Sequence, residues 1–266
     1  MPPYDLFMYA LFFTTGLCFG SFLNVIIYRV PRQLSLISPP SRCPSCNHRL
    51  GFLELIPLLG YLLLKGRCRH CQVQISPRYP LIELATGLLF VLVYQLFNVT
   101  FEGFGYLVLL FILLGVALID LDHRIVPNTL VAAGLLTGAV MHIPALASYL
   151  FFIPPWLLAI RPWSDALLGL LLGGGVMLVI ILVSRGGMGA GDLKLMALIG
   201  LFVGLRGAAV TMMLAFMLGG LTGITLMMIR KVGRKDAVPF APFLSLAALM
   251  QVVWGEQIWT WYNNLL

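Results

Sequence analysis

The sequence predicts an all-α polytopic membrane protein with about eight transmembrane helices and a cytoplasmic, zinc-ribbon-like loop after the first helix. Of its 266 residues, 60% are hydrophobic and 10% are charged, whereas soluble domains are about 45–50% apolar and about 25% charged. The mean hydropathy is +0.98. Apolar runs near the ~20 residues that cross a hydrocarbon core recur from end to end. These observations exclude a soluble fold.

Breaks at charged residues, proline and glycine delimit the apolar runs. The first run lacks a basic start and an obvious small-residue cleavage site, so we expect it to remain as an anchor. Residues 144–164 are apolar but interrupted by prolines, and they are expected to form an interfacial or re-entrant segment, with a ninth helix as the alternative. We predict three regions: a first helix (1–28), a cysteine loop (29–79) and a helical core (80–266). The eight spans are expected at 5–28, 80–97, 104–122, 126–143, 165–184, 193–206, 208–230 and 239–262.

Basic residues decide the orientation. If the chain starts outside, fifteen of the 17 Lys and Arg residues lie in the predicted cytoplasmic turns, and only Arg161 and Arg206 lie on the other side. This bias is the positive-inside signature of an inner-membrane protein. The net charge of +7 therefore reflects topology and not nucleic-acid binding. The basic loop at 29–79 is expected to lie close to anionic lipid headgroups.

The loop carries two Cys-x-x-Cys pairs, Cys43 with Cys46 and Cys68 with Cys71. Each short turn can offer two thiolates to one tetrahedral Zn²⁺ ion, and this spacing is typical of a zinc ribbon. A pair of disulfides is the alternative, but disulfides rarely persist in the reducing cytosol. Four thiolates leave no open coordination position, so the zinc is predicted to be structural.

Three acidic residues lie where a solvated role does not explain them. Asp120 and Asp122 close the third predicted span, and Asp192 opens the sixth after Gly187, Gly189 and Gly191. Ionisable groups at membrane depth are costly and usually mark function. Glycines let the backbone unwind and approach a neighbour closely.

Two carboxylates a few Å apart would share one proton, so that one can act as a base toward water and the other as an acid toward a carbonyl. Asp120 and Asp122 cannot share a helix face. We expect the deeper Asp120 to pair with Asp192, and Asp122 is the alternative. Capping of helix ends at the interface would explain all three without catalysis. Lys194 is expected to extend to the headgroups, with pairing to a carboxylate as the alternative.

The motifs together resemble the bacterial type IV prepilin peptidases, also called leader peptidase/N-methyltransferases, which belong to the Gly-x-Gly-Asp intramembrane aspartic proteases. The resemblance covers almost the whole chain. It rests on the paired Cys-x-x-Cys turns and on these segments: Gly20–Val25 with Arg29–Pro31, Ile75–Pro80 leading to Glu83, Asp120-Leu-Asp122 with Pro127-Asn128, and Gly189-Ala-Gly-Asp192 with Lys194.

The resemblance implies that Asp120 and Asp192 are the catalytic pair. They would cut prepilins or pseudopilins after the glycine that ends a short basic leader and precedes a hydrophobic helix. It also implies methyl transfer from S-adenosylmethionine to the new N-terminal residue, associated with the cysteine-bearing region. No residues for that cofactor can be assigned, because no strand, Gly-rich turn and helix unit is present. The implied location is the bacterial inner membrane, in contact with lipids.

Two other functions remain open from the residues alone. Buried acids in broken helices also build the ion sites of transporters, although no internal repeat is visible between the halves. A zinc-bearing membrane scaffold without catalysis is the second. Glu83, at the entrance to the second span, is expected to be a polar helix end, with support of substrate or cofactor as the alternative.

Overall fold

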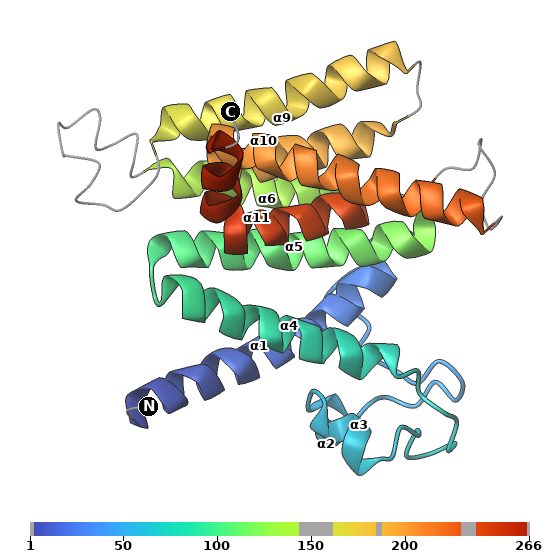
Figure 1. Cartoon of the computed structure of the whole chain (residues 1–266). Coiled ribbons are helices and arrows are strands. Elements are labelled where there is room, and N and C mark those ends of the chain that lie inside the picture. Colours follow the sequence, from blue (N-terminus) through green and yellow to red (C-terminus); the bar gives the residue numbers. More distant parts are fainter. Residues whose placement is uncertain (1–2, 144–161, 185–187, 230–237, 265–266) are drawn as a thin grey trace. The chain divides into compact units, whose positions relative to one another are not determined.

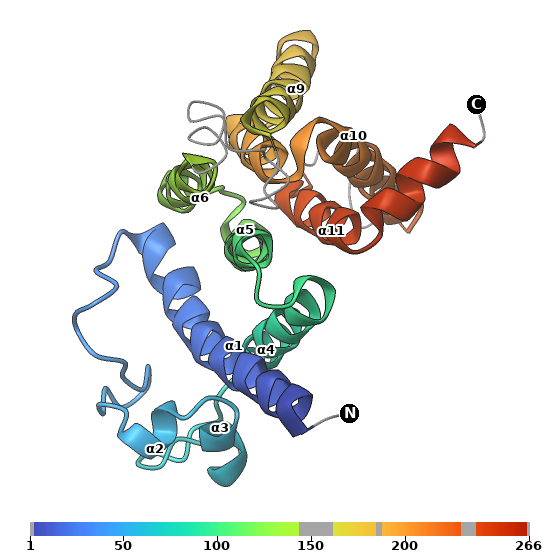
Figure 2. The same cartoon turned by 90° about the vertical axis from the view of Figure 1, so that its left-hand side faces the viewer.

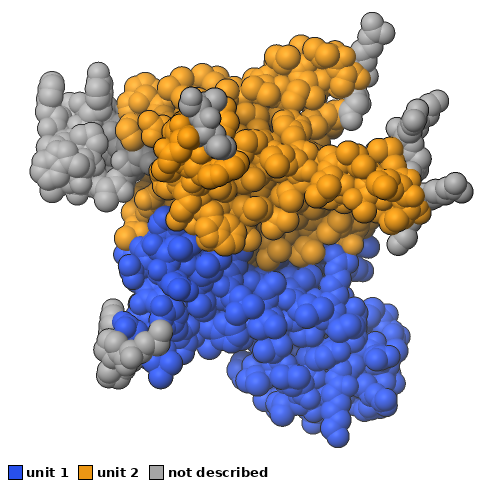
Figure 3. Space-filling model, in the orientation of Figure 1, with its two compact units in different colours: residues 1–99 blue, residues 100–266 orange. Residues whose placement is uncertain are grey.

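The computed structural model describes residues 3–143, 162–184, 188–229 and 238–264. Over these residues the regular secondary structure is all helical apart from two isolated β-bridges (Figure 1), which confirms the predicted all-α class but not the count of eight spans. The chain divides into two compact units, Met1–Val99 and Thr100–Leu266 (Figure 3). The predicted three-region division stays a prediction. Most of the proline-broken segment, Gly187 and the basic turns at 185–187 and 230–237 lie outside the described residues.

Unit 1 is built on a close crossing of two long helices. A Cβ atom added to Gly16 would lie 2.8 Å from the Cα atom of Gly87, and one added to Gly20 would lie 2.6 Å from the Cα atom of Glu83. Small residues at such a crossing let helices pack by van der Waals contact within lipid. The elements are α1 (Pro3–Arg29), η1 (Val30–Arg32), α2 (Phe52–Leu55), α3 (Leu59–Leu63) and α4 (Arg78–Phe97).

Unit 2 places the helix that carries Asp120, α5, against α6 and α11, while α10 packs against α9, α11 and α6. Leu109, Val116 and Ile119 of α5 are fully buried, so this helix contributes much of the core. The elements of the unit are α5 (Phe101–His123), α6 (Asn128–Met141), α9 (Trp163–Val183), α10 (Ala190–Met228) and α11 (Ala241–Asn263).

The two predicted spans at 193–206 and 208–230 correspond to the two helical arms of α10, which meet at Gly204. Gly204 has φ 73° and ψ −174°, a conformation open essentially only to glycine. The two arms of α10 run in opposite directions and lie side by side (Figures 1 and 2). Asp165 of α9 accepts a hydrogen bond from the backbone N–H of Leu205 at 3.1 Å. It therefore supports the turn, a role that the sequence did not suggest.

Five described helices are long and apolar enough to cross a membrane: α1 extended through η1, α4, α5, α9 and α10. The apolar α6 has only 14 residues. The structure therefore supports a multi-pass membrane protein.

The turn at Gly204 makes a prediction about stability. We expect Gly204→Ala to lower the melting temperature in detergent by about 5 °C, because φ is positive and the new Cβ would lie 2.0 Å from Asp165 Oδ2. Gly220→Ala on the second arm is the matched control, since its Cβ would meet nothing within 4 Å. Equal melting temperatures for the two variants would contradict the role of Gly204.

Candidate active site and metal centre

Asp120 lies one turn before the end of α5 and is only 5% exposed. Its Oδ2 atom accepts a hydrogen bond from the backbone N–H of Ala241 at 3.2 Å, and the positive charge of Arg124 acts on the carboxylate. Ala241 is the first residue of α11, and Pro242 follows it within the first turn. The carboxylate of Asp120 is thus placed at the start of a second helix, where free N–H groups favour an anion.

Asp192 lies in the first turn of α10 and is 8% exposed. Gly189 is the N-cap residue, so Asp192 occupies the third helical position. The Asp192 N–H donates to the Gly189 carbonyl at 3.1 Å, and a Cβ atom added to Gly189 would lie 3.5 Å from Asp192 Oδ2. The carboxylate therefore lies beside the backbone at the helix entrance.

The two aspartate motifs meet. The charges of Asp120 and Asp192 act on each other. A Cβ atom added to Gly191 would lie 2.7 Å from the Cβ atom of Val126, so the entrance of α10 touches the turn that follows α5. The structure therefore brings together two acids that are 72 positions apart in the chain.

A second contact links the same motifs. Lys194 Nζ donates a hydrogen bond to Asn128 Oδ1 at 2.9 Å. The roles predicted for Lys194 were extension to the headgroups or pairing with a carboxylate. Neither prediction included a hydrogen bond to an amide side chain. The contact joins the first residue of α6 to the first turn of α10.

Asp122 differs from the other two acids because its side chain is exposed. It lies two positions beyond Asp120 on α5, so the two side chains point in directions about 200° apart. The predicted span at 239–262 includes the start of α11, and the Pro239-Phe240-Ala241-Pro242 segment marks it, because proline in the first turn is typical of a helix start. Sequence reasoning missed that this helix start lies beside Asp120.

The four predicted cysteine ligands converge in unit 1. Their Sγ atoms all lie within 4.8 Å of one another, and the Cys43–Cys71 and Cys46–Cys68 sulfur pairs are separated by 3.8 and 3.9 Å. A tetrahedral ion with metal–sulfur distances of about 2.3 Å has sulfur–sulfur edges of about 3.8 Å. All four thiols are free, so the cluster fits a metal site and not the disulfide alternative.

The two cysteine turns have the same backbone. Asn47 and Gln72 each follow the second cysteine of a pair and adopt left-handed conformations, with φ of 56° and 58°. In each turn the first cysteine donates its N–H to a carbonyl five residues ahead, at 2.9 Å. The sequence therefore builds two similar half-sites that face one another.

The thiols respond differently to this environment. Backbone N–H groups of Cys46 and Ser45 lower the pKa of the Cys43 thiol to about 6. At Cys46 the backbone N–H of His48 lowers the pKa of the thiol. Burial and the neighbouring thiols outweigh this effect and raise the pKa to about 12. Such a cluster carries four thiolates only when a cation lies among them.

Glu83 is buried in unit 1, with 8% of its surface exposed. Its Oε2 atom accepts the Leu58 N–H at 2.7 Å, and its backbone lies against Gly20 of α1. Its position is not that of a solvated helix end. Glu83 instead connects the cysteine loop to the α1–α4 pair.

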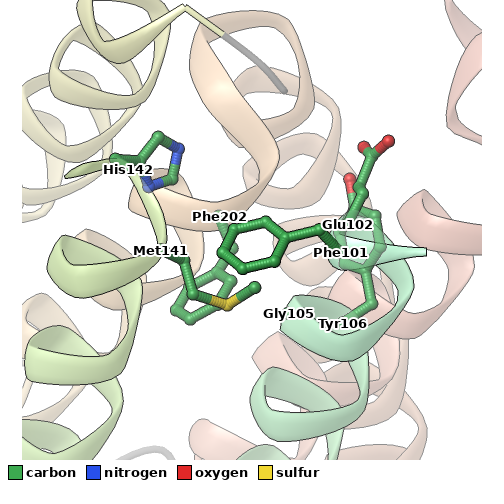
Figure 4. Close-up of a pocket in the computed structure, with 7 residues that line it drawn as sticks. All are labelled: Phe101, Glu102, Gly105, Tyr106, Met141, His142 and Phe202. Carbon is green, nitrogen blue, oxygen red and sulfur yellow. The ribbon is translucent and has the colours of Figure 1, made fainter. Parts of the chain in front are cut away.

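A small pocket of about 40 Å³, partly open to solvent, lies between the start of α5 and the end of α6 (Figure 4). Its α5 residues are about 21–28 Å along the helix from Asp120 at 1.5 Å per residue, so the pocket does not belong to the aspartate site. The lining residues are Phe101, Glu102, Gly105, Tyr106, Met141, His142 and Phe202.

Comparisons with known proteins identify two family regions in the chain. Residues 14–97 match the family described as "Bacterial Peptidase A24 N-terminal domain", and residues 107–224 match the "Type IV leader peptidase family". The first match contains the cysteine cluster and Glu83, and the second contains Asp120 and Asp192. No solved structure matches the chain.

Several curated relatives carry the name "Prepilin leader peptidase/N-methyltransferase". The relative from Aeromonas salmonicida (strain A449) is 34% identical and the match covers 96% of this chain and 93% of that protein. The relative from Bacillus subtilis (strain 168) is 31% identical over 97% and 99%, and that from Myxococcus xanthus (strain DK1622) is 40% identical over 86% and 66%. The order and spacing of the motifs predicted this outcome: the chain belongs to the type IV leader peptidase family.

Proposed function

We propose that this protein is an intramembrane aspartic endopeptidase that removes the basic leader from type IV prepilins or pseudopilins. We also propose that it methylates the new N-terminal residue with S-adenosylmethionine. The observation that carries the peptidase proposal is the meeting of two buried aspartates, Asp120 and Asp192, from separate helices. The names of the relatives support both activities.

The proposed chemistry uses one shared proton. The ionised carboxylate removes a proton from water, and the oxygen of that water attacks the carbonyl carbon of the leader glycine. The protonated carboxyl donates its proton to the carbonyl oxygen, which gives a neutral tetrahedral intermediate. The C–N bond then breaks, the amine takes a proton from the acid formed in the first step, and a hydroxyl proton of the intermediate returns to the other carboxylate. The dyad is thereby restored.

Asp120 is the better partner for Asp192 than Asp122 is. Asp120 is buried, accepts the Ala241 N–H and acts electrostatically on Asp192. Asp122 is exposed on another side of α5. Burial matters because a protected pocket shifts the pKa of a carboxyl group, and such shifted carboxyl groups are typical of aspartic dyads.

The cysteine cluster is proposed to hold one structural Zn²⁺ ion through Cys43, Cys46, Cys68 and Cys71. The sulfur separations support a tetrahedral ion. An ion with four thiolate ligands has no open position for water, so it would fix the loop and not hydrolyse the substrate. The residues that bind S-adenosylmethionine are not assigned.

We propose eight membrane crossings in the inner membrane, with the cysteine loop and both aspartates on the cytoplasmic side. At 1.5 Å per residue, the arm of α10 after Gly204 is about 36 Å long and can cross the ~30 Å hydrocarbon core. The arm before Gly204 is about 21 Å long, as is α6, so these two would cross where the bilayer thins around them. Together with α11 they complete the proposed count. The basic residues of the loop support this orientation.

Substitution of either dyad acid is expected to abolish leader cleavage. Asp120→Asn and Asp192→Asn should each lower the rate by about 10²–10⁴-fold, because one acid–base step is lost. The measurement is the mass of a purified prepilin after incubation in detergent with the enzyme. Asp122→Asn is the matched control and should retain at least half of the activity. Full cleavage by both dyad variants would refute the peptidase proposal.

The Lys194–Asn128 hydrogen bond is expected to position the dyad. Lys194→Met and Asn128→Leu should each lower kcat/KM by about 3- to 10-fold, as expected for loss of a hydrogen bond to a charged group at an exposed site. The double variant should lose no more than either single variant, and Lys194→Arg should recover part of the activity. Additive losses in this cycle would show that the two side chains act independently.

Metal content tests the cysteine cluster directly. Elemental analysis of the purified protein should give about one zinc per chain. Cys46→Ser and Cys71→Ser should each lower this value to near zero, whereas Cys18→Ser, outside the cluster, should leave it unchanged. Retention of zinc in both cluster variants would exclude the assigned ligands.

A further inference from the structure

Helices α2 and α3 form a short hairpin between the two cysteine turns. They pack at Gly60, where an added Cβ atom would lie 2.8 Å from the Leu53 carbonyl oxygen. Figure 1 shows the two helices side by side in unit 1. Because the cysteine pairs flank the hairpin in the chain, a closed metal site would hold the two ends of this segment together.

The hairpin exposes large apolar side chains. Five of them, which we name the hairpin surface, are between 55% and 82% exposed. Soluble loops rarely present so many apolar side chains within so few residues unless they bind something. The hairpin surface consists of Phe52, Leu53, Leu59, Leu62 and Leu63.

The hairpin lies at the depth of the first turns of α4. Leu58, which connects α2 to α3, donates its N–H to Glu83 Oε2 at 2.7 Å. Glu83 is five residues beyond Arg78, the first residue of α4, which is about 7–8 Å along the helix axis. Since α4 is long and apolar enough to span a membrane, the hairpin lies beside the membrane-embedded part of α4. It does not lie beyond the end of that helix.

The charges around the hairpin favour an anionic lipid surface. The loop at 29–79 contains eight basic residues and one acidic residue, Glu54. Arg49 precedes α2, and Lys65 and Arg67 follow α3; all three are exposed. Glu54 accepts the Gly51 N–H at 2.6 Å and so caps α2. Cations next to an exposed apolar surface are typical of elements that lie in the membrane interface, with the apolar side 5–10 Å deep.

We propose that the α2–α3 hairpin is a monotopic membrane element. Its hairpin surface inserts among the acyl chains of an anionic leaflet next to α4, and its flanking cations lie at the phosphates. Glu83 sets the depth through its bond to Leu58, and the cysteine cluster closes the base of the inserted segment. This proposal does not depend on the peptidase activity.

The test uses the full-length, zinc-containing protein in vesicles of phosphatidylcholine and phosphatidylglycerol. A bilayer-soluble aryl diazirine is photolysed, and labelled peptides are identified by mass spectrometry. The peptide that contains residues 52–63 should be labelled at least five-fold more than the peptide that contains 69–74, and as strongly as a peptide from α4. No more label at 52–63 than at 69–74 overturns the proposal.

A second measurement identifies the occupant. p-Benzoyl-phenylalanine is introduced in place of Phe52 or Leu63, with the exposed Arg69 as the matched control position, and zinc content reports folding. Photolysis should give phospholipid adducts at positions 52 and 63 and few at 69. Adducts from both hairpin positions to residues 100–266, to a second chain or to added prepilin would instead show a protein-covered surface and overturn the proposal.

Discussion

The aspartate site depends on one steric constraint, which is the contact between the entrance of α10 and the turn after α5. At Gly191 the backbone lies so close to Val126 that a methyl group would overlap the valine side chain. Two acids that are each buried at the end of a helix can act on each other only if those ends touch. Two properties of glycine therefore explain the glycine-rich segment before Asp192. Glycine has no side chain that would overlap the neighbouring turn, and its backbone is free to unwind.

The first arm of α10 is also held in place by close contacts at glycine residues. An added Cβ atom on Gly169 of α9 would lie 2.2 Å from the Gly200 carbonyl oxygen, and one on Gly173 would lie 2.6 Å from that of Met196. Backbones this close gain dispersion energy over a large contact area without polar side chains. Asp192 lies at one end of this arm and Gly204 at the other. The arm is thus fixed along its length by α9 and at its entrance by Val126.

The sequence predicted those features that depend on composition or spacing. The membrane class, the four converging cysteines and the family followed from apolar runs, the two Cys-x-x-Cys pairs and the order of the motifs. It did not predict that Asp165 would support the turn at Gly204, that Lys194 would bond to Asn128, or that Ala241 would donate to Asp120. Each of these contacts joins segments about 40 or more positions apart. Their partners are chosen by tertiary packing, and no local pattern encodes that choice.

The separation of the two proposed sites also limits what each can do. The cluster of four thiols lies in Met1–Val99, whereas Asp120, Asp192 and their backbone donors all belong to Thr100–Leu266. Water activation by a metal would need an open coordination position. A site of four thiolates offers none, while two carboxylates that share a proton already provide a base and an acid. The proposed hydrolysis therefore needs acid–base groups of the second unit only, while Glu83 holds the cysteine loop through the Leu58 N–H.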